Sequence, residues 1–205
     1  MIDAGNRQTG SVTLTLIRHG RTEWNHRGLV QGSSDVPLDN VGRQQARMAA
    51  DRMAASGSRW DVIVSSPLIR ARETAAILAD RLTLKLGPVY PEWTEQHFGE
   101  AEGLADIEVE RRWPDWRMPG RETDEAVRTR GSVALARLAE DFGSRDVILV
   151  AHGTIIRSAL ASLTGRSHTH YPPLENLSTS TASYVDGAWR VLTIGGVAVE
   201  ASINS

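Results

Sequence analysis

The sequence predicts a three-layer α/β/α fold, in which helices cover both faces of a mainly parallel sheet and an antiparallel hairpin follows at the C-terminal end. Three short apolar runs, 12–17, 61–65 and 146–151, alternate with helical patterns, and each run ends in a polar turn that contains glycine or proline. Such runs are typical of strands buried on both faces. Their alternation with helices is typical of parallel sheets.

Apolar and small residues recur at helical spacing in four further segments. These segments are 40–56, 67–82, about 124–143 and 153–164. For the second of them we expect Ser66 as the N-cap and Pro67 at the first helical position. A serine oxygen accepts a hydrogen bond from the first turn, and proline needs no donor there.

Two runs near the end, 180–185 and 188–194, flank Asp186-Gly187. Because this dipeptide favours a tight turn, we expect the two runs to be antiparallel neighbours. Residues 96–123 are the least regular part of the chain, and we expect them to form an insertion or lid over one rim of the sheet.

The chain shows no internal repeat and no low-complexity linker. We therefore expect a single domain over residues 11–205, preceded by a flexible polar tail over residues 1–10.

Composition excludes several classes of partner. The 205 residues carry a net charge of -2, so we expect no broad basic surface for a nucleic acid or an anionic membrane. No run approaches the ~20 apolar residues that cross a bilayer, and the polar first residues lack the apolar core of a signal peptide. The chain has no cysteine, which is compatible with the cytoplasmic location that we expect. The sequence leaves open whether the chain forms a homodimer.

Cationic side chains follow the predicted parallel strands. Arg18 and His19 follow the first strand, His152 follows the third, and Arg70 lies one helical turn past the second. The carboxyl ends of parallel strands meet at one rim of a sheet, where ligands bind. Two arginines and two histidines at that rim predict a pocket for a phosphate group.

The histidine pair also suggests covalent chemistry. A neutral imidazole can attack phosphorus and form a phosphohistidine. Neighbouring arginines favour the neutral imidazole, because a second positive charge beside them is disfavoured. Arginines and a protonated His152 would stabilise the phosphoryl oxygens without a metal ion or cofactor, and a carboxylic acid would protonate the leaving alcohol. His168 and His170 lack a third ligand, so we expect no metal site there.

Five segments resemble, in order, the motifs of the histidine phosphatase (phosphoglycerate mutase-like) superfamily: LIRHGRTEWN, QGSSDVPLD, SSPLIRARETA, EWTEQHFGEAEG and LVAHGTIIR. The resemblance implies that His19 is phosphorylated, that Glu95 is the acid–base carboxylate and that His152 is the second histidine of the pocket. The phosphate contacts that it implies are Arg18, Arg70, Asn25, Gln31 and Gly32. Candidate contacts to the rest of the substrate are Arg21, His97 and Phe98.

The resemblance implies a metal-independent phosphomonoester hydrolase that acts on a small phosphorylated metabolite, and it leaves two alternatives. One is a phosphoglycerate mutase, which His97 favours. Mutases of this family carry a substrate-gripping lysine where Asp106 stands here, and the pair Arg111-Arg112 is followed by WPDW, a pattern of the phosphatase branches. The other is an inactive module that binds a phosphorylated ligand. We expect Arg21 to favour substrates with a second anionic group.

Overall fold

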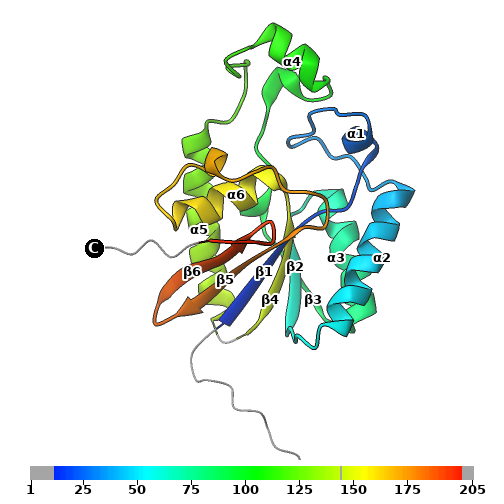
Figure 1. Cartoon of the computed structure of the whole chain (residues 1–205), viewed down its shortest axis with the longest axis vertical. Helices are drawn as coiled ribbons and strands as arrows, with labels where there is room; N and C mark the ends of the chain where they lie inside the picture. The colour runs from blue at the N-terminus through cyan, green and yellow to red at the C-terminus, as the bar shows by residue number, and fades with distance from the viewer. Residues whose placement is uncertain (1–11, 144, 200–205) are drawn as a thin grey trace, which may run out of the picture.

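The computed structural model describes residues 12–143 and 145–199. In this part of the chain, seven strands form one sheet in the order β3-β2-β4-β1-β5-β6-β7 (Figure 1). The strands are β1 (Val12–Arg18), β2 (Val62–Ser65), β3 (Leu86–Val89), β4 (Val147–Ala151), β5 (Thr179–Val185), β6 (Ala188–Ile194) and β7 (Val197–Ala198). The helices are α1 (Glu23–His26), α2 (Asn40–Ala55), α3 (Ile69–Leu82), α4 (Asp106–Arg112), α5 (Asp124–Phe142) and α6 (Gly153–Ser162). Three short 3₁₀ turns cover Pro91–Trp93, Gly99–Ala101 and His168–His170.

The three predicted parallel strands are confirmed. Strand β4 lies between β1 and β2 and runs parallel to both. Val150 is in register with Ile17 on one side and with Ser65 on the other, so the three strands end at the same level. Residues that follow them are therefore delivered to one rim of the sheet.

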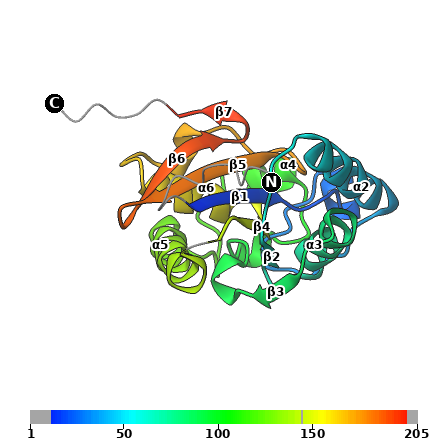
Figure 2. The ribbon, with the colours of Figure 1, turned by 90° about the horizontal axis from the view of Figure 1, so that it is seen from below.

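Alternate side chains of these strands point to opposite faces of the sheet and pack into two separate hydrophobic cores. On β4, Val147 and Leu149 pack into the cluster that includes α5 and α6, whereas Ile148 and Val150 pack into the cluster that includes α2 and α3. Figure 2 shows the sheet between these helices. Because successive strand side chains point to opposite faces, a strand buried on both faces must be apolar throughout. This confirms the predicted three-layer fold.

The predicted start of α3 is wrong. The helix begins at Ile69, its N-cap is Leu68, and the Ile69 nitrogen donates to Asp35 Oδ1 at 2.6 Å. Ser66 Oγ instead accepts a hydrogen bond from the Leu68 nitrogen at 3.3 Å and contacts His152. Ser66 and Pro67 therefore form the loop between β2 and α3, and the serine hydroxyl serves the rim of the sheet.

The sheet also has strands that the sequence did not reveal. Strand β3 reads LGPV and β7 has two residues, so neither shows an apolar run. Both lie at edges of the sheet, where a proline such as Pro88 is tolerated because its missing N–H faces away from the neighbouring strand. The predicted hairpin is confirmed: β5 and β6 are antiparallel, and Asp186 and Gly187 both have positive φ, as a tight primed turn requires.

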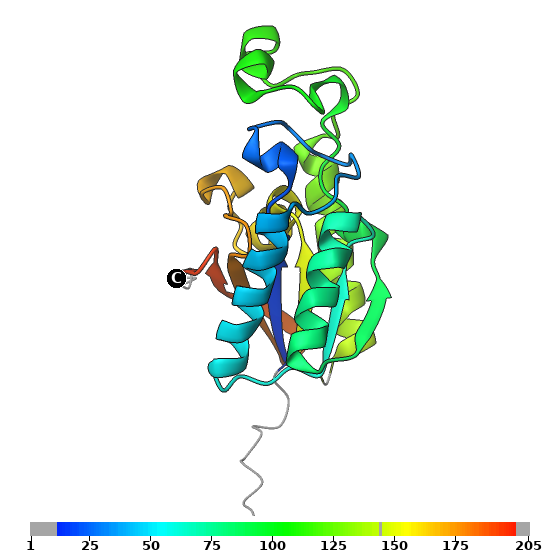
Figure 3. The same ribbon diagram turned by 90° about the vertical axis from the view of Figure 1, so that its right-hand side faces the viewer.

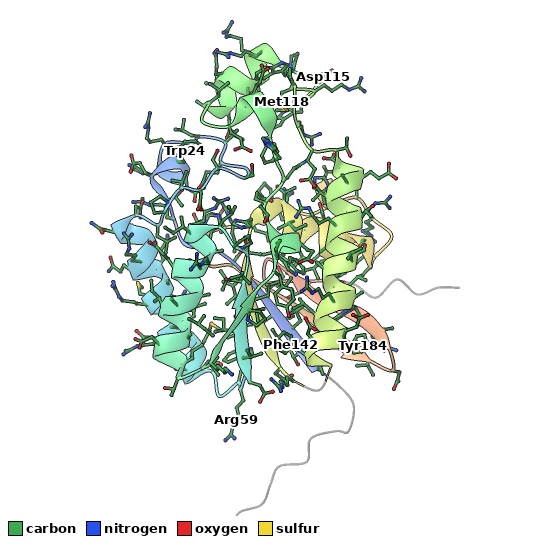
Figure 4. The ribbon with its side chains drawn as sticks, turned by 180° about the vertical axis from the view of Figure 1, so that it is seen from behind. Trp24, Arg59, Asp115, Met118, Phe142 and Tyr184 are labelled. Atoms are coloured by element: carbon green, nitrogen blue, oxygen red, sulfur yellow. The ribbon has the colours of Figure 1, made fainter. Side chains whose placement is uncertain are left out.

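Residues 96–123, which we call the cap segment, are more regular than the sequence predicted. They contain α4 and one 3₁₀ turn, and they build a small apolar cluster of Val30, Ala101, Val109 and Met118. Figures 1 and 3 show α4 beyond the rim of the sheet, above α1. Figure 4 shows Met118 and Asp115 in this outer part, at the opposite end of the molecule from Arg59.

The predicted tail, residues 1–10, lies outside the described residues. Within the described ranges, no helix combines the length and the apolar character needed to cross a membrane.

Candidate active site

Strand ends bring the two histidines together. His19 directly follows β1, and its backbone nitrogen donates to the Ala151 carbonyl at 3.0 Å. His152 directly follows β4, so the rings of His19 and His152 lie side by side with centroids 5.2 Å apart. Both side chains are buried. The register of the parallel strands therefore creates the pair that the sequence predicted at this rim.

The hydrogen bonds of His19 determine which ring nitrogen is free. Its Nδ1 lies 2.7 Å from the Gly20 carbonyl oxygen, which can only accept, so Nδ1 carries the proton. The Nε2 lone pair then accepts a hydrogen bond from Arg70 Nε at 3.2 Å. Burial, followed by the charges of Arg70 and Arg18, lowers the pKa of His19 well below its ordinary value. The ring is therefore neutral, and its unprotonated Nε2 faces the guanidinium of Arg70.

Arg70 reaches the site from the first turn of α3 and is fully buried. Besides its contact with His19, its Nη1 donates to the Ser34 carbonyl at 2.6 Å and its Nη2 donates to the Gly32 carbonyl at 2.7 Å. Burial lowers the pKa of Arg70 to about 10, so the guanidinium keeps its charge at neutral pH. These contacts fix a planar cation beside the free nitrogen of His19.

Arg18 and Glu95 meet at the start of α6. Glu95 Oε2 accepts from the Thr154 nitrogen at 3.0 Å, and Oε1 accepts from the nitrogens of Ile155 and Gln96 at 3.1 and 2.9 Å. A Cβ placed on Gly153 would lie 3.8 Å from the Arg18 side chain and 3.9 Å from Glu95 Oε2. Arg18 also donates to the Leu174 carbonyl. The carboxylate is therefore held in one orientation beside the arginine.

The environment of His152 corrects the expectation that its ring is protonated. Burial, followed by the charges of Arg70, His19 and Arg18, lowers the pKa of His152 well below its ordinary value. His152 Nε2 lies 2.8 Å from Ser66 Oγ, whereas Nδ1 is buried with no hydrogen-bond partner among the described residues. A neutral ring can still donate one hydrogen bond from Nδ1 if Nε2 accepts from the serine hydroxyl.

These groups open into a cavity of about 300 Å³ between the rim of the sheet and the cap segment. Its lining includes most of the residues that the sequence implicated: Arg18, His19, Asn25, Gln31, Gly32, Arg70, Glu95 and Phe98. His152 lies beside His19 without lining the cavity itself. A hollow of about 740 Å³ beside α2 and β1 is larger, but its lining contains no imidazole.

Within the part of the chain that the structure describes, no three histidine, cysteine, aspartate or glutamate side chains group as they would to hold a metal ion.

A sequence profile of the histidine phosphatase superfamily (branch 1) matches residues 14–196. The chain belongs to this superfamily. It is 33% identical over 177 residues to the uncharacterized phosphatase PhoE of Bacillus subtilis, covering 86% of this chain and 90% of that protein. It is 32% identical to the 2,3-bisphosphoglycerate-dependent phosphoglycerate mutase of Methylobacterium radiotolerans, covering 79% of this chain and 84% of the mutase.

The fold of the superfamily extends over nearly the whole chain. A solved structure of mycobacterial glucosyl-3-phosphoglycerate phosphatase with VO3 matches with a TM-score of 0.78 at 28% identity, and the match covers 90% of this chain and 98% of that one. The family resemblance found in the sequence is therefore confirmed, and the relatives include both phosphatases and a mutase.

Two of the predicted substrate contacts lie away from the cavity of this superfamily member. Arg21 donates from Nε to Asp39 Oδ2 at 2.8 Å, and it does not line the cavity. His97 is more than half exposed and places Nδ1 2.9 Å from Glu102 Oε1. Both side chains have found partners nearby on the surface, which motif spacing alone does not reveal.

The structure shows how two predicted phosphate contacts, Gly32 and Asn25, are held in place. Gly32 has φ of +53°, and a Cβ there would lie 2.2 Å from Glu102 Oε1, so the close approach requires glycine. Asn25 accepts at Oδ1 from the Thr22 nitrogen and from Asn176 Nδ2, at 3.3 and 3.2 Å. This leaves the amide N–H groups of Asn25 for a ligand.

Sequence reasoning missed three supporting residues. Ser66 contacts His152, and Asn176 donates to the His19 carbonyl at 2.9 Å. Glu102 accepts hydrogen bonds from the backbone nitrogens of Ser33 and Ser34, at 3.0 and 2.9 Å, and so ties the 31–34 loop to the cap segment. Asn176 and Glu102 lie in irregular segments where periodicity carries no signal. Ser66 follows a predicted strand, but a serine before a proline is also typical of a helix N-cap.

Proposed function

We propose that this chain is a metal-independent phosphomonoester hydrolase that acts on a small phosphorylated metabolite through a phosphohistidine at Nε2 of His19. The observation that carries the proposal is the hydrogen-bonding of that ring. Nδ1 is occupied by the Gly20 carbonyl, and the Nε2 lone pair lies beside the guanidinium of Arg70 at the cavity. A neutral nucleophile next to a fixed phosphate ligand is what phosphoryl transfer to histidine requires.

In the first step, Arg18 and Arg70 hold the non-bridging oxygens of the phosphoryl group. The Nε2 lone pair of His19 forms the P–N bond while the bond from phosphorus to the ester oxygen breaks. Glu95, in its protonated form, gives its proton to the leaving oxygen, so the alcohol departs neutral. His152 donates its Nδ1–H to a phosphoryl oxygen while Nε2 accepts from Ser66, so a neutral ring supports the oxyanion.

In the second step, water attacks phosphorus and the P–N bond breaks. The Glu95 carboxylate, which held no proton after the first step, accepts one from the attacking water. Inorganic phosphate leaves, and His19 returns to its neutral form. Glu95 thus acts as acid and then as base, and each turnover consumes one ester and one water.

The side chains around the cavity favour hydrolysis over the mutase reaction. The cavity lining carries Asp106, whose charge would repel the carboxylate of a phosphoglycerate. Arg111 and Arg112, which superficially resemble a mutase arginine pair, both bond to Glu108, at 2.7 and 2.6 Å, and do not line the cavity. A mutase would need at least one such cation free to hold the substrate.

The test is hydrolysis of p-nitrophenyl phosphate in excess EDTA. We expect turnover by the wild-type protein and inhibition by vanadate, which mimics the five-coordinate phosphorus of the transition state. His19→Ala should lower kcat by on the order of 10⁴-fold, whereas His26→Ala, which changes an exposed histidine outside the cavity lining, should retain activity.

Three results would overturn the proposal. The first is undiminished hydrolysis by His19→Ala. The second is interconversion of 3- and 2-phosphoglycerate faster than phosphate release, which would make the chain a mutase. The third is tight phosphate binding without any turnover, which would favour the inactive binding module.

A further inference from the structure

The cavity has two chemically different ends. The end at the rim of the sheet carries Arg18, His19 and Arg70. Beyond it, the lining consists mainly of apolar, aromatic and acidic side chains: Leu29, Val30, Phe98, Trp116 and Asp106. Among the described residues, Arg18 and Arg70 are the only arginines of the lining, and no lysine joins them. The outer end therefore has no cation for a second anionic group.

Three arginines that lie close in sequence to cavity residues form ion pairs outside the cavity. Arg21, which we expected to favour a second anionic group, bonds to Asp39. Arg111 and Arg112 share Glu108. This corrects the expected preference for a substrate with two anionic groups, since the guanidinium that motivated it does not face the cavity.

Backbone pairing fixes Asp106 at the outer end. The Val30 nitrogen donates to the Leu104 carbonyl at 2.9 Å, and the Gly103 nitrogen donates to the Val30 carbonyl at 2.8 Å. The Asp106 nitrogen donates to the Gly28 carbonyl at 3.3 Å, which continues the pairing. Within the described ranges, the Asp106 side chain makes no ion pair or hydrogen bond. Partial burial, with the charge of Glu110, raises its pKa, as expected for a carboxylate without a cation.

Two aromatic rings belong to the outer end, and the amide of Gln31 also lines the cavity. Phe98 and Trp116 pack edge to face, with ring centroids 6.5 Å apart, and both line the cavity. Gln31 is 8% exposed, and its Oε1 is buried with no hydrogen-bond partner among the described residues. Aromatic faces and a carboxylate attract an organic ammonium group, and an unpaired carbonyl oxygen accepts an N–H.

We propose that the preferred substrate is the phosphate ester of an amino alcohol, whose ammonium group binds between Asp106 and the rings of Phe98 and Trp116. This inference rests on the proposed phosphatase function and specifies its substrate class. The phosphoryl end of such a substrate meets arginines and its amine meets a carboxylate, so the charges of ligand and cavity match at both ends. Hydrolysis would release the amino alcohol and inorganic phosphate.

The test compares three short esters of similar size: phosphoethanolamine, propyl phosphate and phosphoglycolate. Their alcohols end in an ammonium, a methyl and a carboxylate group. We expect kcat/KM to fall by about tenfold from phosphoethanolamine to propyl phosphate and by about tenfold again to phosphoglycolate. Each tenfold step corresponds to about 1.4 kcal/mol. Asp106→Asn should reduce the ratio between phosphoethanolamine and propyl phosphate to about one, and Asp106→Lys should reverse the order.

Glu100→Gln is the matched control, because this exposed carboxylate lies in the cap segment but does not line the cavity. It should leave the ratio between the esters as in the wild-type protein. If His19-dependent hydrolysis of propyl phosphate occurs but the ratio is one or is insensitive to Asp106→Asn, the substrate class is wrong and the phosphatase function stands. If no ester, including p-nitrophenyl phosphate, is hydrolysed, both proposals are overturned.

Discussion

The rim of the sheet beneath the cavity, which we call the floor (Arg18, His19, Arg70 and His152), and the cap segment hold their polar side chains in different ways. On the floor, Arg70 and His152 are fully buried and His19 is 3% exposed. In the cap segment, Ile107 is 75% exposed, and the arginines of α4 bond to Glu108 at the surface. A buried cation that donates to backbone carbonyls cannot be exchanged without loss of both fold and chemistry. We therefore expect the floor to determine which bond reacts and the cap segment to determine which alcohol is accepted.

The largest effect should come from Arg70→Met. This change leaves the carbonyls of Gly32 and Ser34 without their donor and removes the cation beside His19. We expect kcat/KM to fall by on the order of 10³-fold and the free energy of unfolding to fall by about 3 kcal/mol. Urea unfolding and steady-state kinetics measure the two losses.

Arg72→Met on the same helix is the control, because Arg72 is exposed. It should change neither quantity measurably. Equal effects of the two substitutions would show that the floor is no more constrained than the surface.

The second-largest effect should be a pH dependence of the free energy of unfolding, caused by the two histidines of the floor. Burial and neighbouring arginines lower the pKa of both His19 and His152 in the folded protein. Below pH ~6.5 the unfolded chain binds protons that the folded chain excludes, so stability falls as pH falls through that value, by about 1.4 kcal/mol per pH unit for each histidine. Urea unfolding between pH 7 and pH 5 measures this slope.

His152→Gln should remove the contribution of one proton from that slope, whatever its effect on stability at pH 7. His26→Gln, on exposed α1, should leave the slope as it is. An unchanged slope in His152→Gln would mean that His152 takes up a proton in the folded state as readily as in the unfolded chain.

Ser66→Ala should have a smaller effect on catalysis than Arg70→Met. The substitution removes the hydroxyl that contacts His152 Nε2, so the ring loses the partner that sets its tautomer. A neutral hydrogen bond contributes up to about 1.5 kcal/mol, which corresponds to about tenfold in rate, so we expect kcat to fall by about tenfold while KM changes little. Nitrogen chemical shifts of His152 should report a change of tautomer.

Ser132→Ala, at an exposed position of α5, is the matched control for loss of a hydroxyl. A Ser66→Ala protein with wild-type kcat and an unshifted His152 spectrum would show that the serine only shapes the loop.

The smallest effect should come from Glu108→Gln in the cap segment. Its ion pairs with Arg111 and Arg112 lie at the surface, where such pairs contribute little. We expect the Tm to stay within experimental error and kcat/KM for propyl phosphate to change by less than about twofold. A loss comparable to that of Arg70→Met would remove the distinction between floor and cap segment.

The same distinction explains what could be predicted from the sequence. The floor depends on local patterns: an apolar run ends, and Arg18, His19 or His152 follows it. Parallel pairing then brings the ends of β1 and β4 to one level. Short stretches of sequence indicate both the strand ends and their parallel pairing, so the fold and the central residues of the candidate site were predictable.

The remainder depends on which of several polar partners a side chain contacts. Arg21 bonds to Asp39, and His97 bonds to Glu102. Ser66 contacts His152, which is 86 residues away in sequence. Helix α3 begins later than predicted, and its first nitrogen, that of Ile69, donates to Asp35 Oδ1, 34 residues away in sequence. Sequence periodicity does not predict which of several polar partners a side chain contacts. The arrangement of the outer end of the cavity depends on contacts of this kind.

The central claim is that the phosphoryl group is transferred to Nε2 of His19. The direct measurement uses Glu95→Gln with p-nitrophenyl phosphate, whose leaving group needs no acid. Because the variant lacks the base for water attack, the phosphoenzyme should accumulate. Phosphorus NMR and peptide mass spectrometry of the alkaline-quenched protein should find one phosphoryl group on His19, bonded to Nε2. A phosphoryl group on Nδ1 or on another residue, or turnover with no phosphoenzyme in any quench, would contradict this account.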